Sequence, residues 1–202
     1  MSDANTKTIN FIAQIKIKID SLLKEFATGK LNRDQFHAVY EHYSSQLRIA
    51  EQALGDGAEM AALDSPATVA ILESRMGKAL GVVIYNNKSG TMVETLGDFD
   101  VPSSRIAAIL NDFTMLIETG KAVEHRIEKV DASHWLLFVG GQYTTIVTLF
   151  KNEPSLQQAR EMERLHRDFE SANQPYFKGA HIDSSKLAYP FLVFIQRKLK
   201  QS

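Results

Sequence analysis

The sequence has no cysteine, which excludes disulfide bonds, thiol nucleophiles and cysteine-ligated zinc or iron–sulfur sites. Charges of both signs nearly cancel, to a formal net charge of -1, which argues against nucleic-acid binding through a broad basic face. Residues 1–10 lack the apolar core of a signal peptide. The apolar run at 192–195 is far shorter than the roughly 20 residues that cross a bilayer. We therefore expect a soluble cytoplasmic protein.

Signatures of catalysis are also missing. No Gly-rich run leads into Gly-Lys-Ser or Gly-Lys-Thr, so the chain is not itself a GTPase of the phosphate-loop type. No nucleophile with a recognisable elbow or base accompanies the histidines. We therefore predict a protein that is not an enzyme and that has no catalytic residues, no cofactor and no resident metal.

What is present is an ordinary globular composition. The 202 residues are 44% hydrophobic and 23% charged, which is enough apolar material to fill a core. This length fits one domain with an appendage, or two small domains.

The first 57 residues predict two amphipathic helices. Apolar residues alternate at spacings of three and four, as in a coiled-coil seam. They are Ile12, Ile15, Ile19, Leu22 and Phe26, and then Phe36, Tyr40, Tyr43, Leu47, Ala50 and Leu54. Gly29 fits a left-handed C-terminal cap, and Asn32 with Gln35 fits an N-terminal capping box. The short connection favours an antiparallel hairpin, and the glycines at 55 and 57 indicate its end.

The rest of the chain alternates between short strands and helices. After a short helix that begins at Pro66, we predict strands at 80–85 and 91–96 and a helix at 102–119. Strands at 123–130, 135–139 and 143–150 follow, and then a long helix that begins at Pro154 and ends at Pro175. Short connections within each strand group require antiparallel neighbours. The predicted fold class is α+β, with a five-stranded antiparallel sheet.

Three segments result from this pattern. They are a helical hairpin at 1–57, an α/β domain at 65–175 and a C-terminal tail at 176–202. The tail carries Phe191, Leu192 and Phe194 ahead of basic residues at 197, 198 and 200. It either docks on its own domain or a dimer mate, which we favour, or touches a membrane surface or partner.

The element order over residues 65–173 resembles the roadblock / dynein light chain family. The similarity lies in the apolar strand at 80–85 with its turn at 86–90, the central helix at 106–117, and the strand pair at 135–139 and 143–149. Profilin-like, longin and PAS or GAF sensor domains have related layouts. The N-terminal hairpin is outside the common pattern of the family.

The resemblance implies a homodimer formed through the central helix and an edge strand. Many such domains are scaffolds or activating partners of small Ras-like GTPases, and in bacteria some act beside gliding-polarity GTPases. The function that follows is a non-catalytic, homodimeric regulator or scaffold. Its candidate dimer interface comprises Ile106, Ile109, Phe113, Glu124, Arg126 and Glu128, and its candidate partner surface comprises Phe191, Leu192 and Phe194.

The alternative function is a sensor that holds a small ligand between the sheet and the helices. It requires polar residues that point into a cavity, for which Thr145 and His125 are the candidates. Without such a ligand, a polar residue at a core position has its hydrogen bonds satisfied by other residues of the fold.

Two polar pairs and one glycine pair are candidate sites. Glu163 and His166 have the Glu-x-x-His spacing of di-metal bundles, but His166 falls on the apolar stripe of its helix, which favours a core histidine. His125 and His134 lie on either side of a turn, where cross-strand partners can approach each other, but two polar residues on an exposed sheet face are the favoured interpretation. The glycines at 140 and 141 indicate a tight turn rather than a ligand loop.

Overall fold

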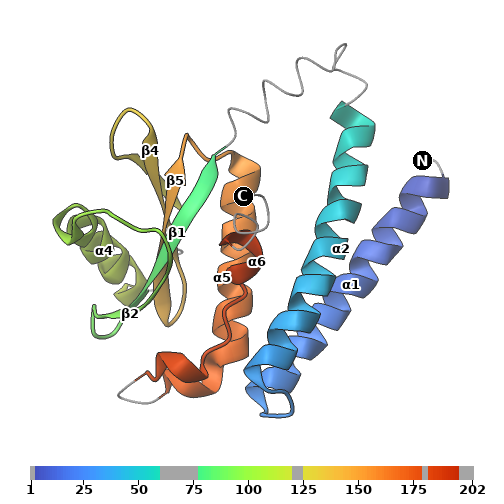
Figure 1. The fold of residues 1–202 in the computed structure, drawn as a ribbon, viewed down its shortest axis with the longest axis horizontal. Coiled ribbons are helices and arrows are strands. Elements are labelled where there is room, and N and C mark those ends of the chain that lie inside the picture. The colour runs from blue at the N-terminus through green and yellow to red at the C-terminus, as the bar shows by residue number, and fades with distance from the viewer. Residues whose placement is uncertain (1–2, 60–76, 120–124, 179–181, 196–202) are drawn as a thin grey trace. The chain divides into compact units, whose positions relative to one another are not determined.

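The computed structural model describes residues 3–59, 77–119, 125–178 and 182–195. The chain divides into two compact units, Met1–Arg75 and Met76–Ser202, and both are drawn in Figure 1. The short helix predicted from Pro66, Glu124 and the basic residues at 197, 198 and 200 lie outside the described residues. None of the described helices has the length and hydropathy needed to span a membrane.

The first unit is the predicted pair of antiparallel helices, α1 (Asp3–Ala27) and α2 (Arg33–Glu59). The apolar seam predicted in α1 is buried along its whole length. In α2 the fully or nearly fully buried side chains are Phe36, Tyr40, Leu47 and Ala50, while Tyr43 and Leu54 are half-buried. The spacing of three and four thus locates the face on which each helix packs.

The turn between the two helices has the predicted caps. Gly29 adopts a φ of 74°, in the left-handed region that glycine enters without steric cost. The backbone N–H of Gln35 donates to Asn32 Oδ1 at 2.8 Å, and the N–H of Asn32 donates to Gln35 Oε1 at 3.0 Å. These reciprocal bonds satisfy two of the N–H groups that a helix start leaves free.

The second helix extends past the glycines at which its apolar pattern breaks, where a linker or a frayed helix end was expected. α2 continues through Gly55 and Gly57 and ends at Glu59. A glycine costs only about 1 kcal/mol relative to alanine inside a helix. Because extending an existing helix is favourable once it has nucleated, two isolated glycines do not stop it.

The second unit is a five-stranded antiparallel sheet, as predicted. Its strands are β1 (Lys78–Asn86), β2 (Met92–Gly97), β3 (Arg126–Lys129), β4 (His134–Gly140) and β5 (Thr144–Lys151). They lie in the order β2-β1-β5-β4-β3, so β2 and β3 are the two edges. The first strand pairs with the last, which brings the β1–β2 turn close to the β4–β5 turn.

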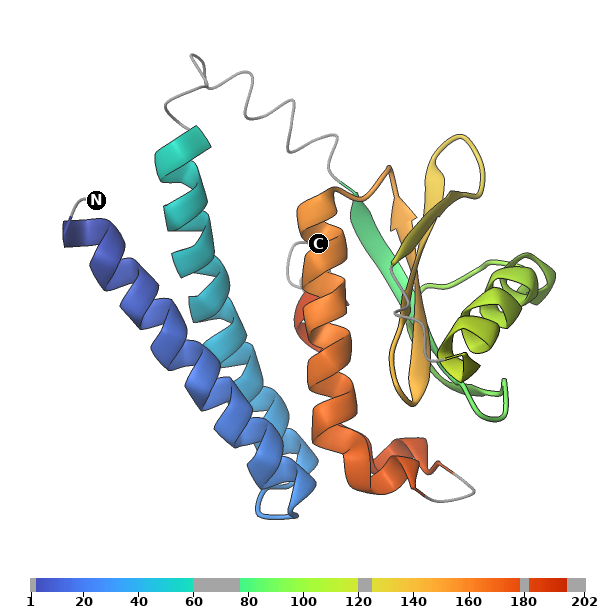
Figure 2. The same ribbon diagram turned by 180° about the vertical axis from the view of Figure 1, so that it is seen from behind.

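Helices lie on both faces of this sheet (Figures 1 and 2). α4 (Ser103–Glu118) packs on one face through a cluster of buried apolar side chains. The cluster comprises Ile106, Phe113, Leu136, Phe138, Val147 and Leu149. Alternation along the strands turns Leu137, Ile146 and Phe150 to the other face, which α5 (Leu156–Phe177) covers.

The C-terminal segment returns over α5. It contains a 3-10 turn, η1 (Ser184–Lys186), and a single helical turn, α6 (Leu192–Ile195). Leu187, Ala188 and Phe191 are completely buried. α5 also extends two residues beyond Pro175, where we predicted its end. A proline this close to the helix end removes a single hydrogen bond from the last turn, which the helix tolerates.

Candidate functional site

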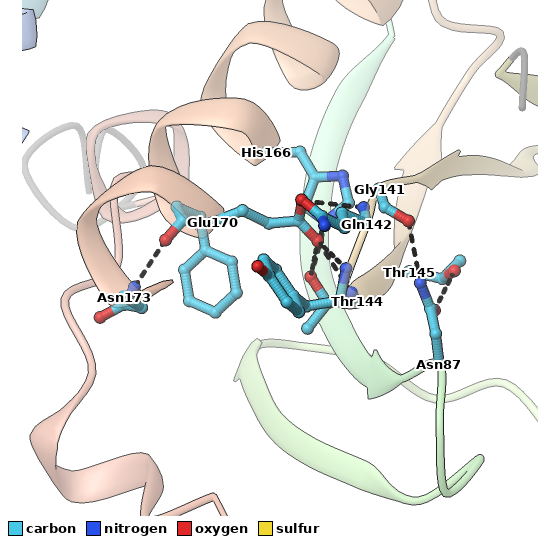
Figure 3. Close-up of polar contacts among 10 residues, drawn as sticks. Asn87, Gly141, Gln142, Thr144, Thr145, His166, Glu170 and Asn173 are labelled. Atoms are coloured by element: carbon cyan, nitrogen blue, oxygen red, sulfur yellow. Dashed lines mark hydrogen bonds and ion pairs between the residues drawn. The ribbon is translucent and has the colours of Figure 1, made fainter. Parts of the chain in front are cut away.

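A cluster of polar side chains lies where α5 meets the turns at one end of the sheet. We call it the hairpin junction and define it by Asn87, Gly141, Thr144, His166 and Glu170 (Figure 3). These residues come from the β1–β2 turn, the β4–β5 turn, the start of β5 and the middle of α5. Buried polar groups must find partners, so the pattern of their hydrogen bonds reveals what the cluster does.

Glu170 is the centre of the hairpin junction. Its carboxylate accepts from the backbone N–H groups of Gln142 at 2.9 Å, Tyr143 at 2.8 Å and Thr144 at 2.8 Å. The Thr144 hydroxyl donates to it as well, at 3.0 Å. A Cβ on Gly141 would lie 2.5 Å from Glu170 Oε1, so only glycine leaves room for this carboxylate. Glu170 therefore fixes the β4–β5 turn to α5.

His166 is the second member, and its imidazole is fully enclosed. Its Nε2 lies 2.8 Å from Thr144 Oγ1 and 3.8 Å from Glu170 Oε1. Burial lowers the pKa of His166 to about 4, an effect that Glu170 opposes and Arg167 reinforces. The ring is therefore neutral near pH 7. Since the Thr144 hydroxyl donates to Glu170, it accepts from the Nε2–H of His166, which assigns the tautomer.

Asn87 links the two turns to each other. Its Nδ2 donates to the Gly141 carbonyl at 2.9 Å, and its Oδ1 accepts from the Thr145 hydroxyl at 2.7 Å. Its own backbone N–H donates to the Tyr143 carbonyl at 3.0 Å. The side chain thereby extends the pairing of β1 with β5 beyond the last ladder bond.

Asn173, one turn beyond Glu170, holds the C-terminal segment. Its Oδ1 accepts from the backbone N–H of Ala188, and its Nδ2 donates to the Ala188 carbonyl, both at 2.8 Å. Around it, Phe169 contacts Phe191 and Tyr189 with ring centroids 5.3 and 5.9 Å apart. The tail thus docks on α5 through a buried amide and an aromatic cluster.

Next to the hairpin junction, a groove of about 470 Å³ runs along α5. We call it the α5 groove. Its polar lining comprises His125, Arg160, Glu163, Arg167 and Glu170, and its apolar lining includes Leu156 and Val139. His125 Nδ1 lies 2.6 Å from Glu163 Oε1, which ties the start of β3 to α5.

The approach of His125 to His134, the less favoured of the two options for these residues, does not occur. The register pairs Arg126 with Phe138 and Lys129 with Trp135, so His125 and His134 lie at opposite ends of the hairpin, roughly 15 Å apart. His134 Nδ1 instead lies 2.9 Å from Asp131 Oδ2. The N–H of Ser133 and then the His134 ring hold the pKa of the Asp131 carboxyl at about 2.

Glu163 and His166 do not act as a pair. Glu163 bonds His125, while His166 bonds Thr144 on the neighbouring strand. Within the described ranges, no group of three His, Asp or Glu side chains is arranged to hold a metal ion. Thr145, a candidate ligand contact of the sensor hypothesis, is used by Asn87.

The five predicted dimer-interface residues that the structure describes lie in three settings. Ile106 and Phe113 have 1% and 3% of their surface exposed and pack into the core under α4. Arg126 and Glu128 lie on the edge strand β3, with their side chains joined at 2.5 Å. Arg126 also lies 3.5 Å from Asp112 on α4, so the helix and the edge strand are neighbours. Ile109 is half-buried beside the core under α4.

The predicted partner surface also divides. Phe191 is completely buried in the aromatic cluster and cannot offer its ring to a partner without leaving that cluster. Leu192 and Phe194 are half-buried in α6, where Phe194 meets Phe150 with ring centroids 6.3 Å apart. Of the two predicted roles of the tail, the described residues take the first, docking on their own domain.

Asn87, Thr144, Glu170 and Asn173 were not predicted from the sequence. A signal for one of them was present, because Asn173 is a polar residue seven positions after His166 on the apolar face of the same helix. Polar residues on a buried stripe require partners elsewhere in the chain. Nothing local in the sequence, however, assigns those partners to the turns at residues 87 and 141–144.

No family model matches the sequence, and no curated protein does. Among solved structures, MglC from Myxococcus xanthus is similar at 13% identity and a TM-score of 0.32, over 50% of this chain and 90% of that chain. Myxococcus xanthus MglB is similar at 15% identity and a TM-score of 0.36, over 50% of this chain and 85% of that one. The roadblock-like layout itself rests on this chain's element order, which is two strands, a helix, three strands and a helix.

Proposed function

We propose that the protein is a non-catalytic regulatory or scaffold module that forms a homodimer through the β3 edge. The partner class that the roadblock resemblance implies is a small Ras-like GTPase, and the compartment is the cytoplasm. The observation that carries the proposal is the geometry of β3, an edge strand whose outward backbone groups and charges are self-complementary.

The backbone of β3 supports this first. The N–H of Val130 donates to the His134 carbonyl, so Val130 faces β4. Because backbone groups alternate along an antiparallel strand, Arg126 and Glu128 also bond β4, and Ile127 and Lys129 direct their N–H and C=O groups outward. An edge strand with unpaired groups is a template for a second strand.

The charges of β3 then select one register. Two copies can pair antiparallel about Arg126, Ile127 or Glu128 and keep their outward groups aligned. Centring on Arg126 or Glu128 places that residue opposite its own copy, so like charges meet. Centring on Ile127 places Arg126 opposite Glu128 of the partner subunit, and vice versa. Opposite charges on facing strands stabilise the pair, whereas like charges destabilise it.

The hydrogen bonds of the hairpin junction support the non-catalytic part of the proposal. Glu170 is occupied by three backbone N–H groups and a hydroxyl, and His166 is buried and bonded to Thr144. A general acid or base must reach the proton that it moves, and neither group is available for that. The polar residues of the hairpin junction therefore serve to fix backbone.

The decisive experiment is analytical ultracentrifugation of the full chain at micromolar concentrations. We expect a dimer for the wild type and a monomer for Ile127→Pro, which removes an outward N–H that β4 does not use. Ile127→Ala shortens the same side chain but keeps the N–H, so it should remain a dimer. A strict monomer at high micromolar concentration, or a dimer that tolerates Ile127→Pro, would overturn the proposal.

A charge swap tests the register. Arg126→Glu should weaken the dimer, because it places glutamate opposite glutamate. Adding Glu128→Arg restores opposite charges across the two-fold axis and should restore the dimer. The GTPase part of the proposal is tested separately, by adding the dimer to Ras-like GTPases and measuring nucleotide hydrolysis. No change in hydrolysis for any of them would remove that part and leave the dimer intact.

A further inference from the structure

The α5 groove contains two carboxylates and two guanidinium groups, and these differ in whether they bond other residues of the fold. Glu170 accepts four hydrogen bonds from the β4–β5 turn. Glu163 Oε1 bonds His125 at 2.6 Å. Both carboxylates are therefore committed to contacts within the fold, and only 14% and 30% of their side chains are exposed.

The arginines of the groove are in the opposite situation. Arg160 and Arg167 are exposed, and within the part of the chain that the structure describes neither makes an ion pair or a side-chain hydrogen bond. Arg164, on the same helix, differs in that its guanidinium bonds Asp168 at 3.2 Å. A guanidinium has five N–H donors and no acceptor, so these two exposed side chains are open to an anionic partner.

The spacing of these arginines restricts the anion. They are seven residues apart on α5, which places their backbones two turns or roughly 10.5 Å apart on one side of the helix. Glu163 lines the groove between them, so a compact anion such as phosphate that both guanidiniums approached would also lie near this carboxylate. A chain with several carboxylates can meet both. At the N-terminal end of the groove, the exposed Leu156 offers an apolar contact, with 55% of its surface open.

We propose that the α5 groove binds an acidic, extended segment of a partner protein through Arg160 and Arg167. Each guanidinium forms a two-pronged hydrogen bond with a carboxylate, and Leu156 packs against an apolar side chain of the segment. The outward groups of Ile127 and Lys129 are not used, so this site does not depend on the β3 dimer. It goes beyond the proposed function by assigning a second binding surface and the chemistry of its partner.

The test is fluorescence anisotropy with the full chain and a short dye-labelled peptide in which glutamate alternates with leucine. The wild type should bind it, and rising salt should weaken binding. Arg160→Gln and Arg167→Gln should each weaken binding by about two- to fivefold, the effect of one solvent-exposed ion pair, and the double variant by about tenfold. The same peptide with glutamine in place of glutamate should not bind.

A matched control removes two positive charges elsewhere. Arg48→Gln with Lys30→Gln changes the net charge equally but leaves the groove lining intact, so it should bind the peptide as the wild type does. An equal loss in this control would reduce the effect to non-specific attraction and overturn the proposal. So would the absence of binding with either binding partner, protein or peptide, at a concentration of about 1 mM, which detects even a millimolar dissociation constant. Binding of inorganic phosphate or anionic lipid vesicles without the peptide would overturn it in favour of a small-anion or membrane site.

Discussion

The hairpin of α1 and α2 and the hairpin junction of the second unit are stabilised by contacts of different kinds. In the helical hairpin, apolar side chains meet at regular spacings, and Phe36 packs between Phe26 and Tyr40 with ring centroids 5.0 and 5.3 Å away. In the hairpin junction, polar side chains meet that lie far apart in sequence, such as Asn87 with Thr145. Burial of apolar surface is non-directional, whereas a buried hydrogen bond requires one particular partner.

This difference has a consequence for substitutions. An apolar seam tolerates replacement by another apolar residue of similar volume, because its contacts have no fixed direction. A buried polar network loses more when one member changes, since its remaining groups are left without partners. The following substitutions measure whether the two regions differ in this way.

The largest effect is expected at Phe169, where both kinds of contact meet. Its ring is fully buried and touches Phe177, Tyr189 and Phe191. Phe169→Ala should lower the free energy of unfolding by about 3–5 kcal/mol, because it leaves a cavity in place of the ring that holds the tail. Urea denaturation measures this, with exposed Met115→Ala as the control that should change stability by less than about 0.5 kcal/mol. A loss of less than about 1 kcal/mol at Phe169 would contradict the packing described.

A second effect depends on pH and is confined to the hairpin junction. The folded pKa of His166 is about 4, below its ordinary value of 6.5. Between these values the unfolded chain carries a proton at this position and the folded chain does not, so stability decreases as the pH falls from about 6.5 to 4. The groups that face the ring are Thr144 from β5, Glu170 and Arg167.

The expected contribution over this range is of the order of 3 kcal/mol, and His166→Gln should remove it. The measurement is urea denaturation of the wild type and the variant at about pH 7 and at about pH 4.5. Burial also lowers the pKa of His37 in the helical hairpin, so His37→Gln serves as the comparison in the other unit. Because His37 is only half-buried, its variant should flatten the pH dependence less. Equal pH dependence in the wild type and His166→Gln would show that the histidine is not the group that titrates.

The features that the sequence predicts are those with local signals, and the long-range polar contacts are not among them. The seam from Ile12 to Phe26, the capping residues Asn32 and Gln35 and the five strands could be predicted, because each leaves a local periodic or turn signal. The role of Glu170 could not be predicted. A glutamate on a helix is usually exposed, and nothing in the neighbouring sequence indicates that three backbone N–H groups of a distant turn donate to it. The segment boundaries at 57, 65 and 175 stay predictions.

The positions of His125 and His134 show why strand register is harder to predict from sequence than the strands themselves. His125 and His134 flank one turn, and both lie on one hairpin, as predicted. Their separation depends on which residues pair across β3 and β4, and a short loop admits more than one register. The Asp131 side chain settles it here by accepting from the backbone N–H groups of Ser133 and His134.

The third substitution, Glu170→Gln, tests the charge of the hairpin junction. An amide oxygen can still accept from Tyr143 and Thr144, but the amide nitrogen cannot accept from the Gln142 N–H. We expect a loss of about 2 kcal/mol, from one lost bond and the missing charge on the others. Glu163→Gln is the matched control, because that carboxylate is more exposed and bonds only His125 among the contacts described. A smaller loss at Glu170 than at Glu163 would contradict the assignment of Glu170 as the centre of the hairpin junction.

The smallest expected effect compares the same local motif in the two units. Asn32 and Gln35 cap α2 reciprocally, and Ser155 and Gln158 cap α5 in the same way. Asn32→Ala and Ser155→Ala should each lower the free energy of unfolding by about 1 kcal/mol, because each leaves one backbone N–H at the helix start without its acceptor. Replacement by glycine should cost only a few tenths of a kcal/mol, although it removes the same side-chain acceptor, because glycine is itself a favourable N-cap residue.

The two motifs differ in one contact, because Gln158 Nε2 also donates to the Gly77 carbonyl at 2.5 Å. Gln158→Ala should therefore destabilise more than Gln35→Ala, since it removes a link between α5 and the segment that precedes β1 as well as a cap. Urea denaturation of all four alanine variants gives the comparison. Equal losses for Gln35→Ala and Gln158→Ala would mean that the bond from Gln158 to Gly77 adds no measurable stability beyond the local cap. The long-range polar contacts that distinguish the second unit would then be limited to the hairpin junction.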